Sequence, residues 1–176
     1  MRKLSLIFSG LFLVLSLFGQ KAPKFPFPFD PKKDADYEKV QPQAVNCMKW
    51  YLSTPINNYK ETFGYMHTFL MVWTAGIKTI PLVMDPAITA PLLEQKAENK
   101  TQYYIVAYLC GEILYELDHR MDNDPVAKQL EGVRAVIKFH QMNKDVLKDS
   151  KPVEKYLELE STGKLDSWVG ENMTKE

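Results

Sequence analysis

The chain has 176 residues, 45% of them apolar, and its 22 Lys and Arg residues equal its 22 Asp and Glu residues in number. This length and composition are typical of one domain with a single hydrophobic core, and they argue against a second independent core. Because the formal net charge is zero, the composition excludes a strong overall electrostatic attraction to nucleic acid or to an anionic membrane.

Residues 1–19 differ from the rest of the chain. Two basic residues precede an apolar run from Leu4 to Phe18, which ends at Gly19. A basic start, an apolar stretch of about 7 to 15 residues and a small residue at its end are typical of a secretory signal peptide, and an uncleaved membrane anchor is the alternative. We therefore expect export to the periplasm or the exterior, with no membrane span after cleavage.

Residues 20–39 are predicted to form an extended Pro-rich arm. They contain four prolines, which fix φ and remove backbone donors, so a helix is disfavoured. Phe25, Phe27 and Phe29 alternate along the segment, which places them on one side of an extended chain. We expect the arm to lie against an apolar groove, either of its own domain or of a partner protein. These three residues and Trp73 are the candidate binding residues.

Residues 40–176 are predicted to form a single all-α domain, a compact bundle of about five to six helices. The first helix is expected over 40–53 and the second over 58–75, where apolar residues recur at helical spacing. A second apolar row in the latter helix consists of Tyr65, Phe69 and Val72. We therefore expect that helix to be buried on more than one side.

The clearest helical periodicity lies in residues 101–120 and 125–143, which are predicted to form a helical hairpin. Asp124 is a suitable N-cap and Pro125 suits a first helical position. Gly111 indicates a point where a neighbouring helix can approach closely. Shorter helical segments are expected on either side of this hairpin, over residues 86–93, over 152–161 and after Gly163.

Five short segments carry a resemblance to known proteins. They are Thr54-Pro55-Ile56-Asn57, Gly132-Val133-Arg134-Ala135-Val136-Ile137-Lys138-Phe139, Asn143-Lys144, Val153-Glu154-Lys155 and Gly163-Lys164-Leu165. Together they resemble a family of small exported helical proteins from Gram-negative bacteria that has no assigned activity. The resemblance covers about residues 40–170. It implies an exported bacterial helical domain, and it transfers no catalytic or binding residue.

Cys47 and Cys110 have two open interpretations. In an oxidising compartment they could pair, and a disulfide closing a loop of about 60 residues would stabilise the fold by roughly 4 kcal/mol. Alternatively, both are buried small apolar side chains, because both lie in apolar helical segments.

One polar pattern in the chain has the spacing of a metal site. Glu112, Glu116 and His119 follow one another at intervals of four and three residues, which places them on one helical face. Carboxylates and imidazoles at this spacing can bind a metal, and an ordinary solvated face has the same pattern.

These observations favour a non-enzymatic exported module that binds an unknown protein partner or a small apolar ligand, without a cofactor and without nucleic acid. Aromatic and Met residues are concentrated in the first half of the chain, where they either form a binding surface or fill the core. The alternative function is a metal-dependent factor or enzyme that uses Glu112, Glu116 and His119.

Overall fold

The computed structural model describes residues 21–93, 100–120, 124–148 and 150–173, and within these ranges the chain is helical and contains no strand. The predicted signal peptide, residues 1–19, lies outside the described residues. The described ranges contain nine α-helices and one 3-10 helix: α1 (Asp34–Lys39), α2 (Gln41–Tyr51), η1 (Ile56–Asn58), α3 (Lys60–Gly76), α4 (Pro86–Leu93), α5 (Lys100–Asp118), α6 (Pro125–Met142), α7 (Lys144–Leu147), α8 (Lys151–Ser161) and α9 (Leu165–Asn172).

The all-α prediction is confirmed, whereas the predicted number of about five to six helices is too low. Helix α1 lies inside the segment that was predicted as an extended arm, because no proline follows Pro31 until after Lys39. The carboxylate of Asp36 accepts hydrogen bonds from the backbone N–H groups of Lys32 at 2.9 Å and Lys33 at 3.2 Å. These bonds satisfy backbone donors at the start of α1. Among the described residues of the arm, 21–33 precede this helix and are not helical.

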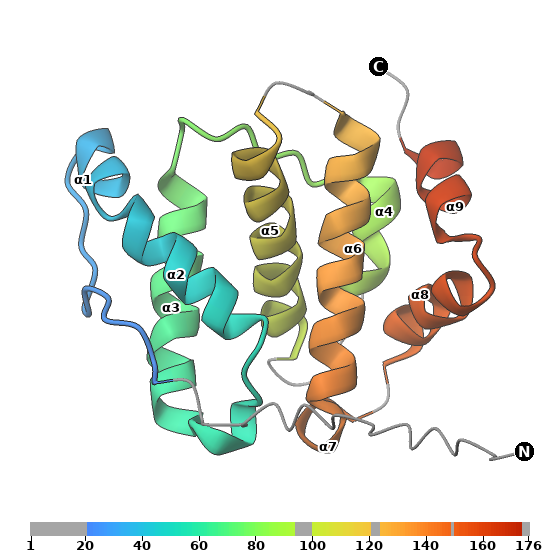
Figure 1. The fold of residues 1–176 in the computed structure, drawn as a ribbon, viewed down its shortest axis with the longest axis horizontal. Coiled ribbons are helices and arrows are strands. Elements are labelled where there is room, and N and C mark those ends of the chain that lie inside the picture. The colour runs from blue at the N-terminus through green and yellow to red at the C-terminus, as the bar shows by residue number, and fades with distance from the viewer. Residues whose placement is uncertain (1–20, 94–99, 121–123, 149, 174–176) are drawn as a thin grey trace, which may run out of the picture.

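The antiparallel helices α5 and α6 form the centre of the molecule (Figure 1). Helices α2 and α3 pack against α5 on one side, and α8 and α9 pack against α6 on the other. The arm and α1 therefore lie on the flank opposite α9 (Figure 1).

The central pair is closely packed at Gly111. A Cβ atom at this position would lie 2.5 Å from the carbonyl oxygen of Glu131 and 2.7 Å from the Cβ of Ala135. Both distances are too short for atoms that do not bond, so only glycine allows α5 and α6 to come this close. The predicted close approach at Gly111 is confirmed.

Aromatic side chains from three helices form much of the core. The ring of Tyr51 on α2 stacks on Phe139 of α6, with centroids 5.0 Å apart, and lies 4.5 Å from Phe63 of α3. All three rings are buried. Much of the aromatic content of the first half therefore fills the core, which was one of its two interpretations.

The two cysteines are not joined. Cys47 and Cys110 are free thiols with no solvent exposure, so the disulfide interpretation is wrong and the buried-thiol interpretation holds. Burial raises the pKa of Cys47 to about 12 and also raises the pKa of Cys110, because the thiolate form is poorly solvated there.

Among the described residues, no helix combines the length and the apolar character that crossing a membrane requires.

Candidate functional site

The arm lies against α3 of its own domain. The rings of Phe25 and Phe29 are each 5.4 Å from Phe69, and Phe29 is also 5.6 Å from Tyr37 of α1. Phe27 instead lies outside this contact, with 46% of its surface exposed and its ring 4.6 Å from that of Tyr65. Two of the three phenylalanines thus anchor the arm, and the third remains accessible.

Trp73, the fourth candidate binding residue, is fully buried. Its indole N–H donates a hydrogen bond to the backbone carbonyl of Tyr37 at 2.9 Å, which ties α3 to α1. A side chain in this position supports the fold and is not accessible to a ligand.

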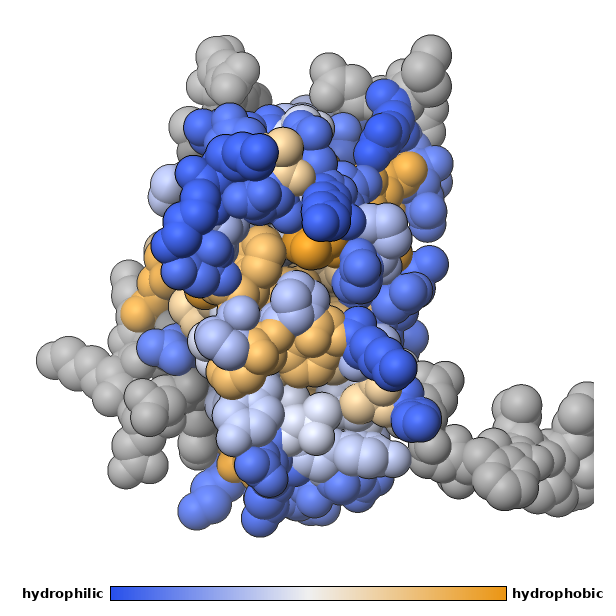
Figure 2. Space-filling view, turned by 90° about the vertical axis from the view of Figure 1, so that its left-hand side faces the viewer, coloured by the Kyte–Doolittle hydropathy of each residue, from blue (hydrophilic) through white to orange (hydrophobic). Residues whose placement is uncertain are grey.

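The outward side of α3 is apolar. Tyr65, Met71 and Val72 are exposed large residues there, and Tyr65 contacts the exposed Phe27 of the arm. We call this surface the α3 face, and it consists of Phe27, Gly64, Tyr65, Thr68, Met71, Val72 and Ala75. Figure 2 shows an apolar area across the middle of this side of the molecule, with hydrophilic side chains around it.

Most of α3 has no charged residue of its own. No Asp, Glu, Lys or Arg occurs between Glu61 and Lys78, and the only titratable imidazole in this stretch is His67. His67 is buried, and burial lowers its pKa to about 4 although a hydrogen bond with Gln102 opposes this shift. It is therefore neutral at physiological pH, so α3 contributes no charge of its own between its first turn and its C-terminus. At the first turn, the carboxylate of Glu61 accepts a hydrogen bond from the hydroxyl of Tyr65 at 2.9 Å.

The structure does not assemble the three candidate metal ligands. Glu112 is fully buried, Glu116 is half-buried, and His119 is exposed at the end of α5 with its ring stacked on Tyr115, centroids 4.2 Å apart. No group of three or more His, Cys, Asp and Glu side chains within the described ranges is arranged to hold a metal ion.

Glu112 belongs instead to a buried polar network centred on Gln129 of α6. The amide Nε2 of Gln129 donates to Oε1 of Glu112 at 2.6 Å and to the backbone carbonyl of Val83, and its Oε1 accepts from the hydroxyl of Tyr108. The backbone N–H of Asp85 donates to the same oxygen at 3.3 Å. One amide side chain thus connects α5, α6 and the segment before α4.

The carboxyl group of Glu112 has an unusual environment. Its Oε2 is buried and has no hydrogen-bond partner. Burial raises the pKa of Glu112 to about 8, although the charge of Lys128 opposes the shift. Lys128 is itself held by Glu116, with Nζ 2.6 Å from Oε2 and both side chains largely buried. Glu112 is therefore mostly protonated at neutral pH.

Two buried tyrosine–histidine pairs complete the polar interior. The hydroxyl of Tyr51 lies 3.1 Å from Nδ1 of His67, and that of Tyr104 lies 2.7 Å from Nδ1 of His140. Each buried imidazole therefore has a hydrogen-bond partner within the core, which accounts for both histidines without a ligand.

A groove of about 550 Å³ opens between α5 and α6. Gly111 and Ala135 line it, and an added Cβ at Gly111 would meet Ala135 across the contact of the two helices. The complete lining is Leu52, Gly111, Leu114, Tyr115, Asp118, His119, Glu131, Arg134, Ala135 and Lys138. Of the predicted metal set, only His119 lines it.

Sequence reasoning missed the exposed part of α3. Tyr65 and Val72 were predicted to be buried with Phe69 as a second apolar row, but only Phe69 is buried. The signal that could have indicated this surface is the absence of charged residues between Glu61 and Lys78.

Compared with family models, curated proteins and solved structures, the chain gives no match. The resemblance to exported helical proteins of Gram-negative bacteria therefore stays a prediction.

Proposed function

We propose that the chain is an exported helical binding module that docks a partner protein through the α3 face and does not catalyse a reaction. The observation that carries this proposal is the exposed apolar surface that Phe27, Tyr65, Met71 and Val72 form, along a stretch of α3 that has no charged residue after Glu61. Export rests on the predicted signal peptide.

The composition of the α3 face suits a protein interface. Monomeric proteins rarely expose extended apolar areas, and aromatic and Met side chains are enriched where proteins meet. From Glu61 to Gly76 the axis of α3 extends about 22 Å at 1.5 Å per residue, which is long enough to align with several turns of a partner helix. Because α3 has no charged residue between Glu61 and its C-terminus, the partner is expected to present a mainly apolar surface to it.

Gly64 allows a sharp test of this proposal. A Cβ atom at Gly64 would have no heavy atom within 4 Å, so a larger side chain fits without disturbing the domain. Gly64→Arg places a charge within the α3 face, one helical turn before Thr68, and burying that charge on docking should weaken docking by at least about tenfold. Gly170→Arg is the matched control, because Gly170 is an exposed helical glycine on α9, on the opposite flank (Figure 1).

The measurement is site-specific photocrosslinking in the producing cell. A benzophenone amino acid replaces Thr68, which is exposed at the centre of the face. We expect a crosslinked protein adduct in the otherwise unchanged chain and in Gly170→Arg, and its loss in Gly64→Arg. An adduct of twice the chain mass would identify the partner as a second copy. No adduct in any of the three proteins, or equal adducts in all, contradicts the proposal.

A further inference from the structure

The segment between α3 and α4 is tied to the central helices through Gln129 of α6. Its residues, 77–85, belong to no helix or strand, and Val83 among them is 53% exposed. The amide of Gln129 binds this segment twice. Its Nε2 donates to the backbone carbonyl of Val83, and its Oε1 accepts from the backbone N–H of Asp85 at 3.3 Å. We call residues 77–85 the α3–α4 connection.

The amide of Gln129 has no spare hydrogen-bonding capacity. A primary amide offers two N–H donors and an oxygen with two lone pairs. The second N–H of Gln129 donates to Oε1 of Glu112 at 2.6 Å, and its oxygen also accepts from the hydroxyl of Tyr108. Glu112 therefore helps to fix the orientation of the amide that holds the α3–α4 connection. A change in the carboxyl group of Glu112 reaches Val83 through this one side chain.

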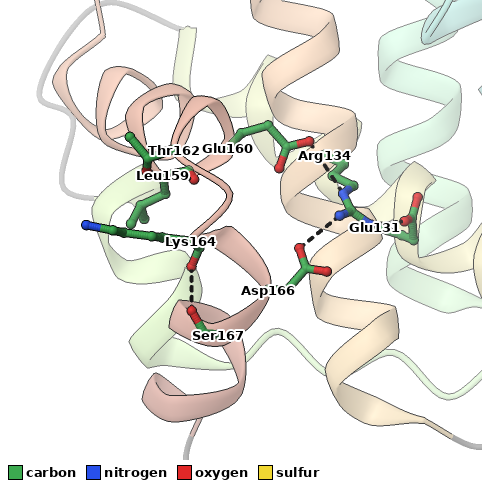
Figure 3. A network of polar contacts seen from close by, with 8 residues as sticks. All are labelled: Glu131, Arg134, Leu159, Glu160, Thr162, Lys164, Asp166 and Ser167. Atoms are coloured by element: carbon green, nitrogen blue, oxygen red, sulfur yellow. Dashed lines mark hydrogen bonds and ion pairs between the residues drawn. The ribbon is translucent and has the colours of Figure 1, made fainter.

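Glu112 differs from the carboxylates at the surface of the domain. Asp166, for example, is largely exposed and lies 2.9 Å from the guanidinium of Arg134 (Figure 3). Glu112 is fully buried, its Oε2 has no hydrogen-bond partner, and the ammonium of Lys128 near it is paired with Glu116 at 2.6 Å. An ionised carboxylate in this place lacks the donors and the water that stabilise a charge.

Titratable groups face Glu112 from the elements packed around it. They are Tyr108 and Glu116 of α5, Lys128 of α6, Asp85 of the α3–α4 connection and Tyr156 of α8. Lys128 favours the charged form of Glu112, but burial outweighs this effect and raises the pKa of the carboxyl group to about 8. Burial also raises the pKa of both tyrosines, which therefore stay neutral.

We propose that the α3–α4 connection is a pH-sensitive latch, which is closed while Glu112 holds its proton and opens when that carboxyl group ionises. The charge on the carboxylate needs donors, and both N–H groups of Gln129 are already used. Opening the connection frees the N–H that Val83 holds and admits water from the exposed side of this residue. The open form thus solvates a carboxylate that the closed form does not, so ionisation and opening favour each other.

Amide hydrogen exchange, resolved by NMR, tests the latch at the backbone N–H of Asp85. Protection is the intrinsic rate divided by the measured rate at the same pH, which removes the ordinary pH dependence of exchange. In the open form Glu112 releases its proton near the ordinary Glu pKa of about 4.3. We therefore expect protection at Asp85 to fall by up to about tenfold per pH unit between about pH 6.5 and pH 7.5. Low concentrations of urea should not change it, because a local opening exposes little surface.

The amide of Val136, in the buried part of α6, is the internal reference for global unfolding. Val136 should stay at least about tenfold more protected than Asp85, and its protection should fall as urea is added. Equal protection and an equal urea dependence at the two amides would mean that the connection opens only when the domain unfolds, which overturns the proposal. This comparison separates the latch from an effect of pH on global stability.

Glu112→Gln has nearly the same shape and no proton to release, so protection at Asp85 should stay level over the same pH range. Asp166→Asn is the matched control, because it removes an exposed carboxylate that pairs with Arg134 at the surface, and it should keep the pH profile of the original chain (Figure 3). A pH dependence at Asp85 that persists in Glu112→Gln overturns the proposal, as does its absence from the original chain. Should Glu112→Gln not fold, the comparison of Asp85 with Val136 in the original chain still decides.

Discussion

The carboxyl group of Glu112 lies on α5 where water does not reach it. A charged carboxylate loses its hydration there, and its single hydrogen bond comes from the amide of Gln129. The raised pKa, about 8, means that the folded protein holds a proton that the unfolded chain releases near the ordinary Glu pKa of about 4.3.

This difference predicts the direction of a pH effect on stability. Between about pH 4.3 and about pH 8 the folded state binds more protons at Glu112 than the unfolded state, so the contribution of this group to stability falls as the pH rises. His67, whose pKa is lowered to about 4, acts in the opposite sense and loses stability as the pH falls below about 6.5. The effect of Glu112 is therefore seen without this opposing slope between about pH 6.5 and pH 8.

Glu112→Gln should remove this pH dependence, because glutamine has nearly the same shape and carries no charge. We expect the free energy of unfolding of the original chain to fall by about 1 kcal/mol per pH unit between about pH 6.5 and pH 8, and that of the variant to stay level. Urea unfolding at several pH values measures both. Parallel pH profiles for the two proteins would show that Glu112 is ionised in the folded state.

At the scale of elements, the contact between α5 and α6 depends on Gly111. An added Cβ meets backbone on one side and Ala135 on the other, so neither neighbour can move easily. We expect Gly111→Ala to lower the free energy of unfolding by about 1 to 3 kcal/mol, which is typical of overpacking, despite the higher helix propensity of alanine.

Gly64→Ala is the control for this prediction, because an added Cβ there meets no atom within 4 Å. It should raise the free energy of unfolding by roughly 0.5 to 1 kcal/mol through helix propensity alone. Chemical unfolding of the two variants compares the effects directly. If the two substitutions gave the same change, close packing at Gly111 would not be the cause.

The long helices could be predicted from the sequence because periodicity and end signals agree there. The hairpin was predicted at 101–120 and 125–143, and the observed helices are Lys100–Asp118 and Pro125–Met142. The predicted N-cap at Asp124 is confirmed, since its side chain accepts a hydrogen bond from the backbone N–H of Ala127 at 3.0 Å. Helices α1 and α7 are too short for a periodic pattern, and so they were missed.

The candidate surfaces could be predicted only in part. Tyr65 and Val72 form a helical row as regular as one facing a core, so periodicity alone does not tell which row is buried. The groove was not predictable, because its lining residues, Gly111 and Ala135 among them, come together from different helices only in the folded chain. Likewise, helical spacing within α5 could not show that Gln129, on another helix, forms a hydrogen bond with the carboxyl group of Glu112.

At the scale of the whole molecule, the arm has two possible roles. It either detaches reversibly from α3, as a lid does, or stays bound to α3 as a permanent part of the domain. Phe25 and Phe29 are half-buried and contact Phe69, a core residue of α3. Removing residues 21–31 would expose that contact to water. Since burying a Phe side chain completely stabilises a protein by about 1.5 to 3 kcal/mol, two half-buried rings are worth a similar total, less the entropy of ordering the arm.

We therefore expect removal of residues 21–31 to lower the free energy of unfolding by about 1 to 3 kcal/mol and the Tm by several degrees. Thermal unfolding followed by circular dichroism measures this effect. Phe27→Ala is the control, because Phe27 is the exposed ring of the arm, and it should change the Tm little. A lid that opens and closes freely would add little to stability, so an unchanged Tm after removal would favour a lid. A clear loss in the shortened chain, with Phe27→Ala near the original value, would instead make the arm a fixed support that holds Phe27 beside Tyr65 on the α3 face.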